Sequence, residues 1–220
     1  MSDAPASEPL KPQLRGVSHQ WAFFVSLVTG AVLVAAAPAG EATLAASIYA
    51  LSVALLFGTS ALYHRVTWRA TARRWMRRLD HSMIFLLIAG TYTPFALLAL
   101  DGTLAIAILV AVWGGALAGV VLKLVWIDAP KWLVAGVYVA LGWVAVAAFP
   151  QMLDRVGVTA RVLGAAGGLL YTAGAVVYAV RRPDPVPSVF GYHELFHALV
   201  IAAAALHYAA VAFYVIPDAS

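Results

Sequence analysis

The chain has 220 residues, of which 63% are hydrophobic and 11% are charged, and it contains no cysteine. Because soluble domains carry roughly 25% charged residues, this composition excludes a disordered chain and argues against a single soluble domain. The lack of cysteine excludes a disulfide framework, a zinc ribbon and a thiol nucleophile, so any metal would need His, Asp, Glu or Ser as ligands.

Seven apolar stretches without Asp, Glu, Lys or Arg follow one another along the chain. Each is long enough for a transmembrane helix, and a helix satisfies its own backbone hydrogen bonds in lipid. The sequence therefore predicts an all-α membrane protein with seven transmembrane helices inside one domain, residues 16–217. The polar residues 1–15 are expected to form a flexible cytoplasmic tail, and residues 218–220 a short outer tail. The predicted spans are 16–40, 42–64, 81–100, 102–122, 132–153, 162–180 and 195–217.

Lysine and arginine are unevenly distributed over the segments between these spans. If the N-terminus is inside, only Arg155 and Arg161 of the 14 basic residues fall outside. Since basic residues favour the inner face, we predict a multi-pass protein of the cell membrane with a cytoplasmic N-terminus and an outer C-terminus. Six arginines fall within residues 65–78, which are predicted to form a short inner loop. Topology and anionic lipid headgroups explain the basic charge, so no nucleic-acid partner is expected.

Ionisable side chains inside membrane spans are costly and indicate functional sites. In the predicted topology five of the six histidines lie near the inner face, and one lies deep in the last span. Among the five near the inner face, His19 is expected at the membrane interface and His81 in a structural or supporting role. The deep residue is expected to be a buried, hydrogen-bonded histidine, His207.

His193 and His197 are separated by four residues, which places both imidazoles on one face of a helix. This spacing lets one helix give two ligands to a single metal ion. The segment also matches the H-E-x-x-H pattern of zinc proteases, but we do not assign the general-base role to Glu194 because this helix lies in a membrane. The alternative is that both histidines are interfacial and pack with aromatic residues.

A second pair with the same spacing, Ser60 and His64, ends the second span. His64 is a candidate third imidazole, and three histidines with an open fourth position are typical of catalytic zinc. Asp80, expected at the start of the third helix, is a candidate base for a zinc-bound water, or a group that orients a ligand. The alternatives are a hydrogen bond from Ser60 to a backbone carbonyl and a simple helix-end charge at Asp80.

Three segments together resemble the hemolysin III family: FGTSALYHR (57–65), RRLDHSMIFLLIAGTYTPF (77–95) and GYHELFHALVIAAAALHY (191–208). That family belongs to a larger superfamily that includes the progestin and adiponectin receptors and resembles the alkaline ceramidases. The resemblance covers almost the whole seven-helix region. It implies a zinc ion held by His64, His193 and His197, a water held by Asp80, and Ser60 as the serine of the motif.

Two functions follow as hypotheses. The first is a zinc-dependent intramembrane hydrolase of a lipid amide or ester, with Asp80 as proton acceptor and Ser60 stabilising an oxyanion, acting in membrane lipid homeostasis. The second is a non-enzymatic sensor or receptor of lipid state, or a pore-forming cytolysin, with structural zinc. The spans contain no charged conduction path, which makes the pore the weaker alternative. Membrane lipids and a lipid substrate or ligand are the expected partners, and the sequence indicates no oligomeric state.

Overall fold

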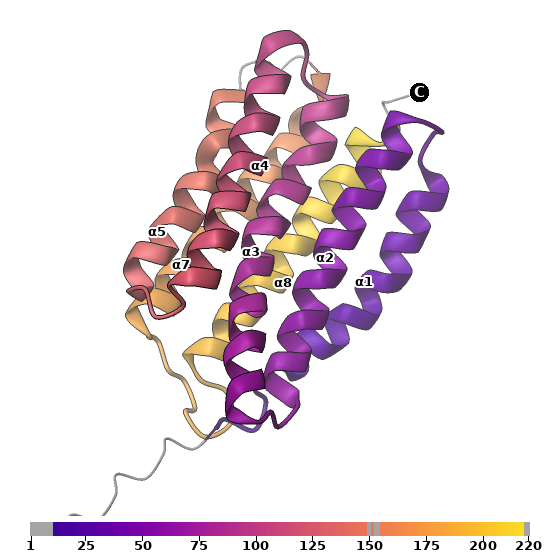
Figure 1. Cartoon of the computed structure of the whole chain (residues 1–220). Coiled ribbons are helices and arrows are strands. Elements are labelled where there is room, and N and C mark those ends of the chain that lie inside the picture. Colours follow the sequence, from indigo (N-terminus) through magenta and orange to yellow (C-terminus); the bar gives the residue numbers. More distant parts are fainter. Residues whose placement is uncertain (1–10, 149–150, 152–154, 218–220) are drawn as a thin grey trace, which may run out of the picture.

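The computed structural model describes residues 11–148, 151 and 155–217. Long helices run up and down along a common direction in this part of the chain (Figure 1). In chain order they are α1 (Val17–Ala36), α2 (Glu41–Arg65), α3 (Ala70–Leu98), α4 (Gly102–Val125), α5 (Lys131–Gly142) with its 3₁₀ continuation η1 (Trp143–Ala148), α7 (Val158–Val180), and α8 (Tyr192–Ala210) with its π-helical continuation η2 (Val211–Val215).

Six of the described helices are long and apolar enough to cross a membrane, and α5 with η1 is a shorter apolar helix. Large apolar side chains such as Trp21, Val110 and Phe213 are more than 60% exposed, as expected of a surface that faces lipid. The protein is therefore an all-α, multi-pass membrane protein, as predicted.

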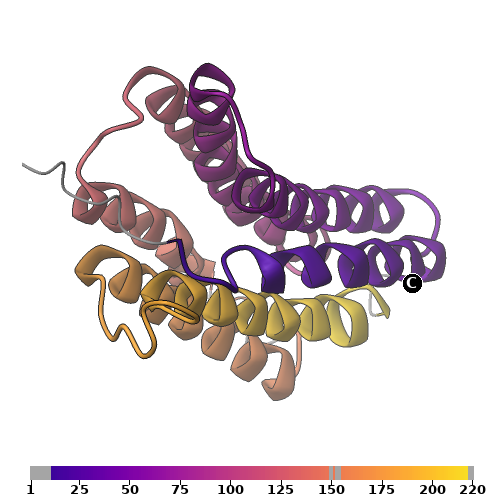
Figure 2. The ribbon, with the colours of Figure 1, turned by 90° about the horizontal axis from the view of Figure 1, so that it is seen from below.

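The helices pack mainly with their neighbours in the chain. The first and the last helix, α1 and α8, also lie side by side (Figure 2). We call one end of the bundle the histidine end. It holds the connections α2–α3 (66–69), α4–α5 (126–130) and α7–α8 (181–191), and it lies at the bottom of Figure 1. The other end is called the opposite end.

Small residues bring α2, α3 and α4 close together. A Cβ atom on Gly90 of α3 would collide with Ser52 of α2, and one on Gly119 of α4 would collide with the Phe85 ring. Small residues at such contacts let helix backbones approach closely in a membrane, where packing rather than hydrophobic exclusion holds helices together. This part of the bundle is therefore tightly fixed.

The predicted start of the third helix, at residue 81, is wrong. α3 begins at Ala70, so four arginines that were expected in a loop lie in its first turns, and Asp80 lies within the helix rather than at its start. The segment 70–80 has no glycine or proline and consists largely of good helix formers. The helix therefore continues beyond the apolar stretch that defined the predicted span.

The fifth predicted span, 132–153, contains a change of helix type. The α-helix ends at Gly142 and continues as a 3₁₀ helix, while residues 149–150 and 152–154 lie outside the described chain. The hydroxyl group of Tyr92 donates to Gly142 O (2.5 Å) and accepts from Ala145 N (2.6 Å). Tyr92 thus satisfies backbone groups at this change.

The other five spans begin and end within about one helical turn of their predicted limits.

The segment before α1 is attached to the histidine end. Gln13 N and Leu14 N donate to the carbonyl oxygens of Ser188 and Val189, each at 3.1 Å, and the Lys11 ammonium donates to His64 O. Partial burial, together with neighbouring arginines, lowers the pKa of Lys11. The remainder of the predicted tail, residues 1–10, and the predicted outer tail, residues 218–220, lie outside the described residues.

Candidate metal centre

The last turns of α2 place Ser60 and His64 on the inner face of the bundle. Both side chains are buried, with 2% and 7% of their surface exposed. Their spacing of four residues aligns them along one face of the helix, as predicted from the sequence. His64 lies at the end of the helix, and Ser60 one turn deeper.

The first turns of α8 place His193 and His197 on the face of this helix that points toward α2. Glu194, between them, accepts a hydrogen bond from Gly191 N at 2.9 Å and forms a capping box at the start of the helix. The Glu194 carboxylate also accepts from the Arg15 guanidinium. Glu194 is therefore engaged in holding the start of α8.

The three histidines predicted as ligands come together at the histidine end. One ring nitrogen from each of His64, His193 and His197 lies within 4.8 Å of the others. The Nε2 atoms of His64 and His193 are 3.2 Å apart, close to the roughly 3.3 Å between two ligands of a tetrahedral zinc ion. Nδ1 of His197 is buried and has no hydrogen-bond partner among the described residues. A donor set of three imidazoles with such a buried nitrogen fits a metal ion of the zinc type.

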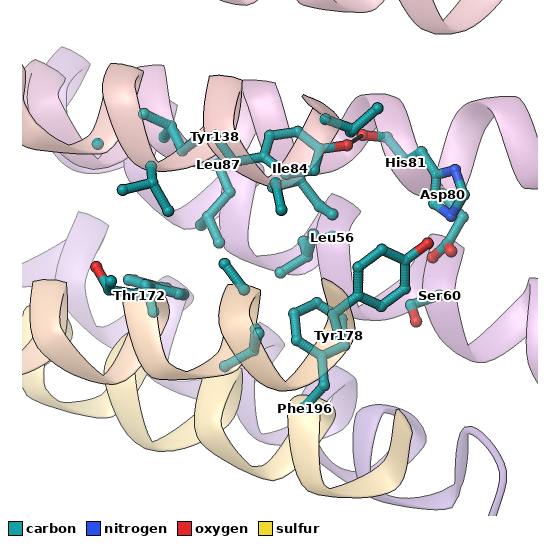
Figure 3. A pocket seen from close by; sticks show the side chains of 18 of the residues that line it. Leu56, Ser60, Asp80, His81, Ile84, Leu87, Tyr138, Thr172, Tyr178 and Phe196 are labelled. Carbon is teal, nitrogen blue, oxygen red and sulfur yellow. Dashed lines mark hydrogen bonds between the residues drawn. The ribbon is translucent and has the colours of Figure 1, made fainter. Parts of the chain in front are cut away.

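Asp80 lies beside this cluster, at the level of His64. Its Oδ2 atom is 3.9 Å from His64 Nε2, and the residue is 9% exposed. Ser60 is close enough to interact with the Asp80 carboxyl group. Figure 3 shows both side chains at one end of a cavity, with the Tyr178 hydroxyl pointing toward Asp80. Asp80 is thus next to the histidines and within reach of two hydroxyl groups.

His19 belongs to the same cluster, although the sequence analysis placed it at the membrane interface. It is 3% exposed, its Nδ1 lies 2.8 Å from Ser60 Oγ, and its ring stacks on His197 at 3.7 Å and 11°. His19 therefore fixes the Ser60 hydroxyl and one face of the His197 ring. The only sequence signal for this role was that His19 begins a span at the same end as the other histidines.

The two remaining histidines lie apart from the cluster. His207 Nε2 donates to Gly164 O at 3.0 Å, which confirms the prediction of a buried, hydrogen-bonded residue. His81 follows Asp80 on α3, and its Nδ1 is buried without a hydrogen-bond partner in the described part of the chain. Its ring faces the edge of Tyr178, with 6.4 Å between ring centroids.

A cavity leads from the cluster into the bundle, and residues of α2, α3, α4, α5, α7 and α8 line it. Its polar end is formed by Ser60, Asp80, His193 and His197, and deeper in the bundle most lining residues are apolar (Figure 3). The apolar lining includes Leu56, Ile84, Leu87, Ile88, Val134, Ala135, Val139, Phe196 and Val200. A site of this form can hold a polar group near the histidines and a hydrocarbon chain in the bundle.

The fold and the site together define a multi-pass helical membrane protein with a buried histidine cluster at one end. The family described as Haemolysin-III related matches residues 8–208, and the chain belongs to this family.

One relative is the Hemolysin-3 homolog of Bacillus subtilis (strain 168), which is 34% identical over 168 residues, 76% of each chain. Another is the Hemolysin-3 of Bacillus cereus, which is 32% identical over 182 residues, 82% of this chain and 79% of the relative. The Monocyte to macrophage differentiation factor of Homo sapiens is 26% identical over 168 residues, 74% of this chain and 67% of the relative.

Proposed function

We propose that this protein is a zinc-dependent intramembrane hydrolase that cleaves an amide or ester bond of a membrane lipid. The observation that carries the proposal is the position of Asp80 and Ser60. Both side chains lie beside three convergent imidazoles, at the polar end of a cavity whose remaining lining is mostly apolar. A lipid with a polar linkage and a hydrocarbon chain matches this arrangement.

The residues that would hold the zinc ion are His64, His193 and His197. When bound by three histidines, zinc acts as a Lewis acid and lowers the pKa of water at its open position. The buried and unpartnered Nδ1 of His197 supports a metal at this place, since an imidazole nitrogen without a partner is costly inside a membrane protein.

Asp80 is suited to accept and hold the proton of the attacking water. Its carboxyl group is 3.9 Å from His64, so it is next to the cluster without belonging to the three-imidazole set. Ser60 is held by His19 at 2.8 Å, with its hydroxyl group near Asp80. A fixed hydroxyl donor is the type of group that stabilises charge developing on a carbonyl oxygen.

The cavity would orient the substrate. The apolar lining residues, among them Ile84 and Val200, favour hydrocarbon chains. The three histidines lie in the terminal turns of membrane-spanning helices. At this depth a bound lipid would present its polar linkage close to the water phase, as a hydrolase of lipids requires.

Asp80→Asn tests the proposal. Purified wild-type protein and the variant are incubated with membrane lipid extract, and the products are identified by mass spectrometry while bound zinc is measured in parallel. The asparagine amide cannot accept a proton, so we expect zinc to remain and product formation to fall by about 100-fold or more. Because neighbouring groups also tune metal affinity, by about 10–100-fold, zinc is kept in excess in the assay.

The same experiment separates the hydrolase from a sensor of lipid state with structural zinc. Full hydrolysis by Asp80→Asn would contradict the role of Asp80 as base. A wild-type protein that binds zinc but releases no product from any lipid class would contradict the hydrolase and favour the sensor.

A further inference from the structure

A second group of charged side chains lines the same cavity, away from the three histidines. Arg77 of α3, Lys123 of α4 and Lys131 of α5 all contribute to the cavity wall near the histidine end. We call these three residues the cationic corner. They come from neighbouring parts of the histidine end, since Arg77 precedes Asp80 by one turn of α3, and Lys123 and Lys131 flank the α4–α5 connection.

Lys123 is the most unusual member of the cationic corner. Only 2% of the residue's surface is exposed, and its ammonium group makes no hydrogen bond or ion pair with the described residues, although the Asp128 carboxylate acts on its charge from further away. A buried lysine without a direct partner is costly in a membrane protein, and such residues generally face a functional cavity or a binding partner. Lys123 lies two residues before the end of α4, at a depth close to the membrane surface.

The other two cations are only partly compensated. Arg77 pairs with Asp128 at 2.7 Å, but the Asp128 side chain is 77% exposed. The Lys131 ammonium lies 4.6 Å from the centroid of the Tyr178 ring and donates to Tyr192 OH at 3.3 Å, and both contacts leave its charge in place. Asp128 pairs with one of these cations, and Asp80 is the acidic side chain that lines the cavity, so three cations stand against two carboxylates and the corner retains an excess of positive charge.

His81 adds a further polar atom at this position. Its buried Nδ1 has no hydrogen-bond partner in the described chain, and the residue lines the cavity next to Asp80. The corner thus offers the ammonium group of a buried lysine and a buried imidazole nitrogen, neither of which has a hydrogen-bond partner in the described residues.

We infer that the cationic corner binds the anionic phosphate headgroup of a membrane phospholipid whose hydrocarbon chain occupies the apolar part of the cavity. The inference deepens the proposed function, because it names the class of lipid that the site selects. To call that lipid a substrate rests on the proposed function, whereas its binding does not. The position near the end of α4 matches the depth of headgroups, and the mostly apolar lining deeper in the cavity matches an acyl chain rather than a soluble phosphate.

Lipid binding to the purified, detergent-solubilised protein tests this inference. Native mass spectrometry gives the dissociation constants for dioctanoyl-phosphatidylglycerol, for dioctanoyl-phosphatidylcholine and for dioctanoylglycerol, which has no phosphate. We expect phosphatidylglycerol to bind about tenfold or more tightly than the other two, since a charge-assisted hydrogen bond contributes at least this much. Equal binding of the three lipids would overturn the inference.

Variants assign the preference to the cationic corner. Lys123→Met should reduce the ratio of affinities to near one, and Lys123→Arg should largely keep it. Arg74→Gln removes the same charge from an exposed position at the same end of α3, so the preference should remain. Loss of preference in Arg74→Gln to the same extent would show a general effect of surface charge and overturn the inference. If Lys123→Met does not fold, Lys131→Gln provides the same test, with a reduction of several-fold expected.

Two further measurements separate the alternatives. If inorganic phosphate displaces phosphatidylglycerol at equal concentrations, the site is one for soluble phosphate and the lipid assignment is wrong. The titration is repeated with Asp80→Asn, which removes the proposed base and one negative charge from the same cavity, so the preference for the anionic headgroup should be at least that of the wild type. A preference that persists in a protein without hydrolytic activity supports the inference even where the hydrolase proposal fails.

Discussion

The two ends of the bundle treat polar groups in opposite ways. The histidine end buries His19, Ser60, His64, Asp80, Lys123, Glu194 and His197. At the opposite end the described ion pair is Asp101 with Arg155, whose side chains are 56% and 57% exposed. Because buried polar groups are costly unless they are paired, a protein accumulates them only where they are used. The comparison indicates that the histidine end is built for function and that the opposite end mainly closes the fold.

The largest expected effect concerns the metal. His193→Ala removes one of the three convergent imidazoles and should lower the zinc content of purified protein from about one ion per chain to near zero. His207→Ala changes a histidine of the same helix that lies deeper and bonds to Gly164, and should leave zinc near the wild-type level. Metal analysis of both variants tests this, and an equal loss would show that the wrong face of α8 has been assigned.

The next effect compares ion pairs at the two ends. Arg15→Ala leaves the Glu194 carboxylate, 2% exposed, without its charged partner, and should lower the free energy of unfolding by about 3 kcal/mol. Arg155→Ala breaks an exposed pair and should cost less than about 1 kcal/mol. Unfolding in mixed micelles gives both values, and similar losses would remove the difference between the ends.

A smaller effect is expected from His19. His19→Ala removes the ring that stacks on His197 and holds Ser60, and should weaken zinc binding by about 10–100-fold while one ion still binds at saturation. A competing chelator measures the affinity. His81→Ala is the control, because His81 does not belong to the three-imidazole set, and a comparable loss there would contradict a specific role for His19.

The last prediction concerns the orientation of the two ends in the membrane, and no change in stability or metal content is involved. The basic residues around the histidine end predict that this end faces the cytoplasm and that the C-terminus lies outside. A reporter fused after Ser220 should therefore read as external, and a cytoplasmic signal would reverse the assignment of both ends.

The sequence was sufficient to predict the helices and most of the cluster. Hydropathy marks a span wherever apolar residues continue, and the two i, i+4 pairs together with their depth selected His64, His193 and His197. It did not predict that α3 begins at Ala70, because the extra turns are polar and carry no hydropathy signal.

Two features of the site depend on tertiary packing and left no local signal. A single histidine has no spacing to interpret, so the stacking of His19 on His197 follows only from the contact between α1 and α8. The cationic corner likewise cannot be predicted from the sequence around Lys123, because its other members lie on α3 and α5.

The change from α5 to η1 has a consequence for bilayer thickness. With 12 residues in α5 and six in η1, the pair extends roughly 30 Å at the usual rises of α and 3₁₀ helices, about the thickness of the hydrocarbon layer. The same residues in α-helix alone would reach only roughly 27 Å. The 3₁₀ turns thus lengthen the described part of this span by roughly 3 Å, a difference that bears on its match to the bilayer. The hydroxyl group of Tyr92 bonds to both sides of this change of helix type, so a side chain of α3 helps to fix the length of its neighbour.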